Sequence, residues 1–220
     1  MTSQAMTSQT ITDSGAELLV QAASLDKTSQ PQIPSNLKSV WSKLAPFAKH
    51  KRHLIYIRDM VEQSIEGKWI GGYTPNGKEA FINLPSWNVS KEELTDALAH
   101  EMHHLVRWQA TGYGRTLGEA IVSEGMACWF AKLQSGWKAP WIEEELPSKE
   151  MLDQIGKEWN DERYDHSEWF FDGRYGKWVG YRIGYRLVKC ALGDVFNIEK
   201  SVCLDEAEAR KFLTKLQATS

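Results

Sequence analysis

The stretch His100-Glu101-Met102-His103-His104 follows the pattern His-Glu-x-x-His and is the most informative part of this chain of 220 residues. On a helix, side chains four residues apart lie on one face about 6 Å apart, so His100 and His104 can bind one zinc ion. Glu101 lies about a hundred degrees around the helix from His100, where its carboxylate can take a proton from a zinc-bound water. These residues predict metal-assisted hydrolysis of a peptide bond.

A capping box indicates where the helix that carries this motif begins. In Ser90-Lys91-Glu92-Glu93, Ser90 can accept from the first-turn amides while Glu93 reaches back to the N–H of Ser90. His103 points away from the predicted apolar face and is expected at the surface. Glu101 falls inside the apolar face, so its carboxylate needs a cation or a strong donor nearby. That face consists of Leu94, Ala97, Leu98, Met102, Leu105, Val106 and Trp108.

Two histidines alone hold zinc weakly, and catalytic zinc sites normally have three protein ligands. A second capping box, Thr116-Leu117-Gly118-Glu119, predicts a helix that runs to about Gln134. Glu124 lies in an apolar stripe of that helix, where a lone carboxylate requires a cation, and it is the favoured third ligand. Glu119 is an alternative, although its capping role already explains it. Cys128 is a softer alternative, for which a place in the core is preferred.

The spacing and the surrounding sequence resemble known peptidases. A glutamate that is separated from the second histidine of the motif by nineteen residues, as Glu124 is from His104, resembles the gluzincin clan, which includes thermolysin-like peptidases and zinc aminopeptidases. Over roughly residues 55–195 the chain is similar to the bacterial family of predicted zinc-dependent proteases to which YjaZ-type proteins belong. This resemblance rests on Ala99–Arg107, Thr116–Ala120, Val122–Ala127, Ala139–Trp141 and Gly180–Tyr185.

The resemblance implies zinc as the cofactor, with His100, His104 and Glu124 as ligands and Glu101 as the general base. It also implies a tyrosine or histidine that stabilises the oxyanion of the tetrahedral intermediate. Tyr181 is favoured for this role, then Tyr185, then His166. Tyr181 and Tyr185 are four residues apart and share a helix face, so an aromatic stripe in the core is an equally good interpretation of either. Gly180 and Gly184 allow another helix to pack closely on the neighbouring face.

Alternating and β-branched residues predict a small sheet before the motif helix. Leu54–Ile57 indicates a strand, and Trp69–Tyr73 and Ala80–Leu84 flank a turn that contains Pro75-Asn76-Gly77, which favours a hairpin. The expected fold class is therefore α+β and gluzincin-like. It comprises a small antiparallel sheet, the active-site helix, the glutamate-bearing helix and a mainly helical C-terminal subdomain.

In gluzincins an edge strand of such a sheet pairs with extended substrate. By this analogy Ala80–Leu84 is the candidate edge strand, and the expected substrate contacts are Ala80, Ile82 and Asn83. Gly71-Gly72 indicates either a close approach of the backbone to another group or a bulge.

Composition limits the classes of partner. A net charge of −3 and a pI near 6.1 provide no electrostatic footprint for nucleic acid.

Residues 1–30 are rich in Ser, Thr and Gln and are expected to be flexible or weakly ordered, whereas residues 31–220 form the predicted metallopeptidase domain, as one domain or two lobes around a cleft. No apolar stretch predicts a signal peptide or a membrane span, so a cytoplasmic protein is expected. Three cysteines, an odd number, argue against a disulfide framework.

The sequence thus predicts a zinc metallopeptidase, with an endopeptidase favoured because the Gly-x-Met-Glu-Asn segment of zinc aminopeptidases is absent. Its expected partner is a peptide or protein substrate, and the sequence carries no signal of oligomeric state. A zinc-binding interaction or chaperone-like protein without turnover is one alternative, and a hydrolase of amides outside proteins is another. Glu101 favours an enzyme, since metal binding alone does not need this residue.

Overall fold

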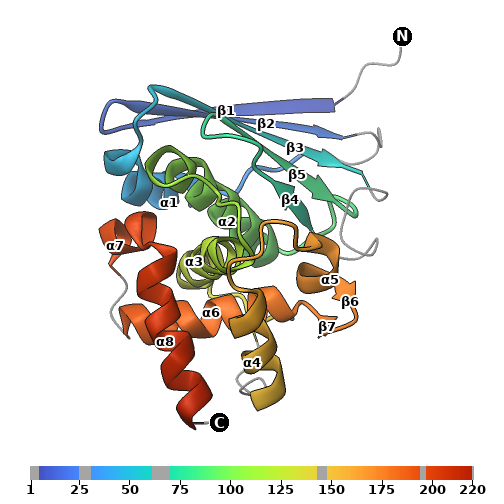
Figure 1. Cartoon of the computed structure of the whole chain (residues 1–220). Coiled ribbons are helices and arrows are strands. Elements are labelled where there is room, and N and C mark those ends of the chain that lie inside the picture. Colours follow the sequence, from blue (N-terminus) through green and yellow to red (C-terminus); the bar gives the residue numbers. More distant parts are fainter. Residues whose placement is uncertain (1–4, 25–30, 61–69, 143–147, 194–196, 220) are drawn as a thin grey trace. The chain divides into compact units, whose positions relative to one another are not determined.

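Five strands form one mixed sheet in a computed structural model of the chain, which describes residues 5–24, 31–60, 70–142, 148–193 and 197–219 (Figure 1). The strand order is β1-β2-β3-β5-β4. The strands are β1 (Ala5–Asp13), β2 (Ala16–Ser24), β3 (Arg52–Asp59), β4 (Gly71–Tyr73) and β5 (Glu79–Leu84). These elements belong to a first compact unit made of residues 1–109 and 131–137, and residues 110–130 and 138–220 form a second.

The sheet differs from the predicted antiparallel one. The pairs β1/β2 and β4/β5 are antiparallel, but β3 runs parallel to both β2 and β5. Parallel neighbours need a crossover connection, which is usually helical. Between β2 and β3 the chain forms the helix α1 (Leu37–Leu44), whose Trp41 is fully buried and donates from its indole N–H to the carbonyl of Ala16. The mixed α/β composition remains compatible with the α+β class.

The segment expected to be weakly ordered instead contains the β1–β2 hairpin, which corrects that expectation for residues 5–24. Ser14 and Gly15 turn the chain with positive φ angles of 48° and 79°, as a tight hairpin requires. Buried and partly exposed residues alternate along β2, and Leu18 and Val20 are fully buried. Apolar residues at every second position of β2 stabilise the pairing, although the polar content of the segment suggested disorder.

The predicted hairpin around Pro75–Gly77 is confirmed as β4 and β5, although Trp69 of the predicted first strand lies outside the described residues. The side-chain oxygen of Asn76 accepts hydrogen bonds from the backbone N–H groups of Lys78 and Glu79 and so closes the turn. Gln109, at the far end of the motif helix, donates to the carbonyl of Gly77 at 2.8 Å.

The predicted edge strand is wrong, because β5 pairs with β3 on one side and with β4 on the other. Ala80 and Ile82 are fully buried, and the side chain of Asn83 accepts a hydrogen bond from Arg58. None of these three residues is therefore placed to pair with a substrate through a free strand edge. Within the described residues β4 ends the sheet. The prediction failed because residue periodicity identifies strands but not their neighbours.

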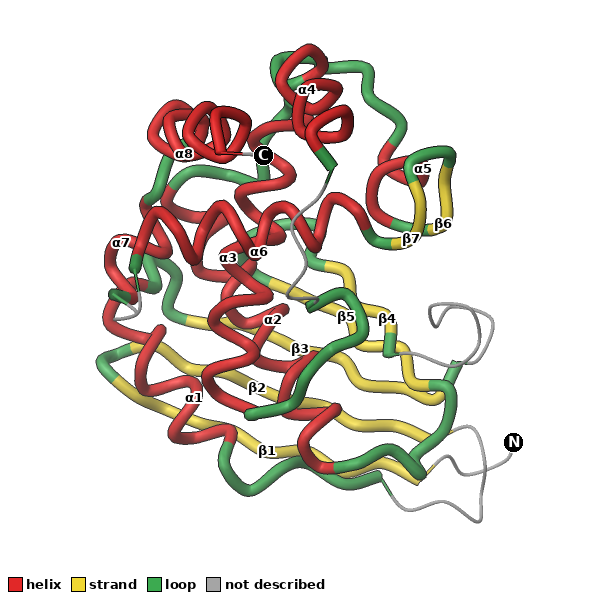
Figure 2. The backbone as a smooth tube through the Cα atoms, turned by 90° about the horizontal axis from the view of Figure 1, so that it is seen from below, coloured by secondary structure: helices red, strands yellow, loops and turns green. Residues whose placement is uncertain are grey.

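The motif helix is α2 (Lys91–Ala110), and it begins as predicted. Ser90 accepts from the N–H of Glu93, and the Glu93 carboxylate accepts from the N–H of Ser90. Figure 2 shows α1 and α2 along the same face of the sheet. His103 is fully buried, which contradicts its expected place at the surface. Burial extends around most of α2, whereas a single apolar face was assumed for the prediction.

The second unit is mainly helical, in agreement with the predicted helical C-terminal subdomain. Its first helix, α3, is capped by Thr116 and Glu119 as expected. In the described residues no helix has both the length and the apolar character needed to span a membrane. The elements are α3 (Leu117–Ser135), α4 (Lys149–Glu158), α5 (His166–Phe170), β6 (Asp172–Gly173), β7 (Gly176–Lys177), α6 (Val179–Leu192), α7 (Ile198–Cys203) and α8 (Glu206–Thr219).

A glycine pair brings α3 and α6 into direct contact. A Cβ atom added to Gly125 would lie 2.2 Å from the backbone of Gly184, so only glycine allows this approach. Gly180 makes similar room for the ring of Phe170. This confirms the close packing predicted from Gly180 and Gly184, and it positions the tyrosines of α6 relative to α3.

Candidate metal centre

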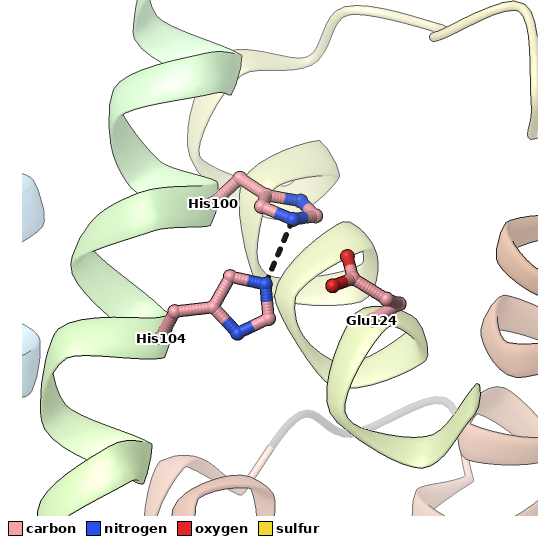
Figure 3. Close-up of side chains that lie close together, drawn as sticks. All are labelled: His100, His104 and Glu124. Carbon is pink, nitrogen blue, oxygen red and sulfur yellow. Dashed lines mark hydrogen bonds between the residues drawn. The ribbon is translucent and has the colours of Figure 1, made fainter. Parts of the chain in front are cut away.

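Three potential metal ligands converge in the structure. The ligand atoms of His100, His104 and Glu124 all lie within 4.8 Å of one another, and Figure 3 shows the two imidazoles and the carboxylate facing each other. The Nε2 atoms of His100 and His104 are 3.0 Å apart. His104 and Glu124 are each 5% exposed. The structure therefore brings together the three side chains that were favoured as ligands from the sequence.

Helical spacing accounts for the pairing of the two histidines. His100 and His104 lie on consecutive turns of α2, and their rings meet edge to face with centroids 4.7 Å apart. Glu124 lies on α3, a helix that begins in the second unit and whose last residues, from Ala131 on, belong to the first.

The three residues fit a zinc ion by donor chemistry and by spacing. Two imidazole nitrogens and one carboxylate form one of the ligand sets of catalytic zinc sites, which leave a fourth position open. Two ligands of a tetrahedral zinc at about 2.1 Å lie about 3.5 Å apart. The imidazole nitrogens of His100 and His104 are 3.0 Å apart, and every pair of ligand atoms lies within 4.8 Å. These two distances lie on either side of the separation expected around zinc.

The two alternative ligands lie outside this group. The carboxylate of Glu119 accepts hydrogen bonds from the backbone N–H groups of Arg115 and Thr116, and these bonds lower its pKa. Glu119 therefore caps α3. Cys128 is 2% exposed, in agreement with the preferred interpretation as a core residue.

Tyr113 contacts the proposed third ligand, and it was not identified from the sequence. Its hydroxyl donates to Oε1 of Glu124 at 2.7 Å. Burial raises the pKa of Tyr113 well above its ordinary value, and the neighbouring Glu124 carboxylate acts in the same direction. Tyr113 lies between Gly112 and Gly114, which both have positive φ angles. A tyrosine in a tight loop just before the ligand-bearing helix was the signal that could have revealed it.

The candidate oxyanion donors occupy different surroundings. His166 stacks on Phe170 with centroids 4.4 Å apart and lies 6.4 Å from the ring of Tyr113. Burial lowers the pKa of His166, while the charges of Glu124 and Asp165 act against this shift. His166 is therefore close enough to Glu124 to sense its charge.

The two tyrosines of α6 contact different aromatic rings. Tyr181 packs edge to face on Phe170 at 5.2 Å, and it contributes to the raised pKa of Tyr113. Tyr185 packs against Trp129 at 5.4 Å. Tyr181 thus lies in the aromatic cluster around Tyr113 and Glu124, whereas Tyr185 packs against a ring of α3.

The carboxylate of Glu101 has the strong donor that its predicted burial required. Glu101 is 4% exposed, and the hydroxyl of Thr74 donates to its Oε2 atom at 2.5 Å. Thr74 directly follows β4 and was not identified from the sequence. A carboxylate at this position is available to exchange a proton one residue from the proposed ligand His100.

A second carboxyl group, that of Asp96, is buried one turn before His100. Asp96 is 5% exposed and accepts a hydrogen bond from the Ser135 hydroxyl at 2.8 Å. Burial raises its pKa to about 6, while the hydrogen bond from Ser135 and the charges of His100 and Lys132 oppose this shift. Asp96 therefore adds negative charge beside His100 when the pH exceeds about 6.

The chain matches, over residues 37–209, the family described as "Predicted Zn-dependent protease (DUF2268)". It belongs to this family. Membership confirms the resemblance found in the sequence and supports zinc as the cofactor of this predicted Zn-dependent protease. No curated protein matches the chain.

The chain is also similar to a protein of known structure. It is an aminopeptidase N family protein from Idiomarina loihiensis, 11% identical in sequence, with a TM-score of 0.45. The match covers 97% of the present chain and 41% of the other. The predicted Zn-dependent protease thus spans less than half the length of that protein.

Proposed function

We propose that this protein is a zinc-dependent endopeptidase of the gluzincin type. His100, His104 and Glu124 hold the metal, and Glu101 is the general base. The observation that carries the proposal is the convergence of the three ligand side chains within 4.8 Å of one another, with the buried carboxylate of Glu101 next to His100 in the sequence. Membership in a family of predicted Zn-dependent proteases supports the same reaction.

Each group of the chain has a distinct task in this reaction. Zinc, when bound, lowers the pKa of a coordinated water to about 7 and polarises the substrate carbonyl. Glu101 accepts the proton of the attacking water and later donates a proton to the departing amine. The Thr74 hydroxyl holds one oxygen of that carboxylate. The Tyr113 hydroxyl donates to Oε1 of Glu124 and so orients that carboxylate.

The proposed substrate strand is β4 in place of β5. It is the terminal strand of the sheet in the described residues, and an extended peptide can add to such an edge through main-chain hydrogen bonds. The side chain of Tyr73 on β4 is 62% exposed. Because Gly72 of β4 lies against the carboxylate of Glu101, a peptide paired with β4 would run close to the proposed base.

We propose Tyr181 as the oxyanion donor, and we expect Tyr181→Phe to lower kcat about a hundredfold to a thousandfold, with KM and Tm nearly unchanged. The hydroxyl is lost but the ring contact with Phe170 is kept. Steady-state kinetics should be measured beside Tyr185→Phe, which removes a hydroxyl one helical turn further on. A loss confined to Tyr185→Phe would assign the role to Tyr185, and unchanged turnover in both would favour His166.

We expect Tyr113→Phe to weaken zinc binding about tenfold to a hundredfold, because partners that orient a metal ligand typically contribute this much to affinity. The ring remains in place, while the hydrogen bond to Glu124 is lost. Zinc affinity should be measured by competition with a chromophoric chelator. Tyr175→Phe, which removes a hydroxyl that donates to Glu158, provides the matched control. Equal affinities for wild type and Tyr113→Phe would contradict a role in holding Glu124.

The proposal as a whole is tested with the wild-type chain. The zinc-loaded protein is incubated with an unstructured protein or a diverse peptide mixture, and the products are identified by mass spectrometry. We expect internal cleavage that a chelator abolishes and added zinc restores. If the folded, zinc-loaded protein cleaves nothing in such a mixture, the proposal fails and a zinc-binding protein without turnover is favoured.

A further inference from the structure

Two residues outside the motif helix shape the surroundings of Glu101. Thr74 is 7% exposed, and its hydroxyl donates to Oε2 of Glu101. A carboxylate side chain has three rotatable bonds, so a buried donor aimed at one oxygen selects among its rotamers. The hydrogen bond is charge-assisted when Glu101 is ionised, which makes it roughly twice as strong as a neutral one.

Gly72 shapes the space around the other oxygen. A Cβ atom at Gly72 would lie 2.1 Å from Oε1 and 2.7 Å from the carboxyl carbon of Glu101. Real Cβ atoms do not approach other atoms this closely, so any larger residue would displace the carboxylate. The close approach of the backbone, one of the two interpretations of Gly71-Gly72, is thus present at Gly72.

We propose that Thr74 and Gly72 are positioning residues for Glu101. The Thr74 hydroxyl fixes one carboxylate oxygen, and the missing side chain of Gly72 leaves room for the other. This inference rests on the proposed function, in which Glu101 is the general base. Both residues come from the four-residue stretch Gly71–Thr74, so the proposed substrate strand also sets the orientation of the base.

Thr74→Val tests the hydroxyl, since valine keeps the shape of threonine but cannot donate. We expect kcat to fall about tenfold to a hundredfold with KM within about twofold, because a displacement of about 1 Å in an active site has this effect on rate. Thr74→Ser keeps the donor and should restore most of the activity. Thr95→Val is the matched control, because Thr95 is buried and donates to Asn36, away from Glu101.

Gly72→Ala tests the space independently of the hydrogen bond. We expect a similar loss in kcat, with zinc content equal to that of wild type. Melting temperatures show whether each variant is folded. If Thr74→Val retains wild-type kcat, or if Thr74→Ser and Thr95→Val lose as much activity as Thr74→Val, the positioning role is overturned.

Crystal structures of the metal-free Thr74→Val and Gly72→Ala variants provide a readout that does not depend on activity. We expect the Glu101 carboxylate to move by about 1 Å or more from its wild-type position. An unmoved carboxylate in both variants would overturn the inference. If the wild type cleaves no peptide, the proposed function fails, whereas displacement of Glu101 in these crystals would still support the positioning by Thr74 and Gly72.

Discussion

Replacement of Glu101 by glutamine is expected to lower peptide cleavage by about a hundredfold to ten-thousandfold, the usual effect of removing a general base. The amide is nearly isosteric with the carboxylate, and its oxygen can still accept the hydrogen bond from Thr74. It cannot accept a proton from water at neutral pH. Because Glu101 lies outside the ligand group, zinc content and Tm should match those of wild type.

The measurement compares cleavage of one peptide substrate by wild type, Glu101→Gln and a chelated sample of wild type. Zinc content is determined on the same preparations. Activity that persists in Glu101→Gln at the wild-type level would identify a contaminating protease or another base, and it would refute the proposed mechanism. Loss of zinc from Glu101→Gln would show that Glu101 contributes to metal binding.

The second large effect is expected for the third ligand. Glu124→Ala removes one of three protein ligands and should weaken zinc binding by at least about a hundredfold, since even partners of ligands contribute tenfold to a hundredfold. Glu119→Ala is the matched control, a glutamate on the first turn of the same helix whose carboxylate caps α3. It should retain zinc and lose about 1 kcal/mol of stability, as expected for a lost cap.

Zinc is measured by elemental analysis after dialysis and by competition with a chelator, and stability by denaturant unfolding. If the Glu119→Ala variant loses its zinc while Glu124→Ala retains it, the assignment of the third ligand is wrong. Equal retention by both variants would place the third ligand elsewhere. Either result would also show that the hydrogen bond from Tyr113 to Glu124 does not serve metal binding.

Features that depend on neighbouring residues in the chain could be predicted from the sequence. A helix places side chains four residues apart on one face, so the pairing of His100 with His104 needed only the motif and its helix. The capping boxes at Ser90 and Thr116 act through hydrogen bonds that span three residues, and both are present. The turn at Asn76 is equally local.

Features that depend on contacts between distant segments were decided by the tertiary structure. The alternation of apolar residues identified β5 as a strand, but its parallel pairing with β3 and its place inside the sheet depend on the crossover topology. His103 was expected at the surface and is buried, because the neighbours of a helix determine how much of its circumference is covered.

The proposed ligands and the proposed base could be predicted from the sequence, because both proposals follow from residue chemistry and helical spacing. The residues that hold these side chains in place could be identified from the folded chain alone. Thr74 reaches Glu101 across 27 positions in the chain and Tyr113 reaches Glu124 across 11, separations at which no local rule relates two side chains. A buried carboxylate requires a donor, so the need for these partners could be inferred from the sequence, but their identity depends on how the chain folds back on itself.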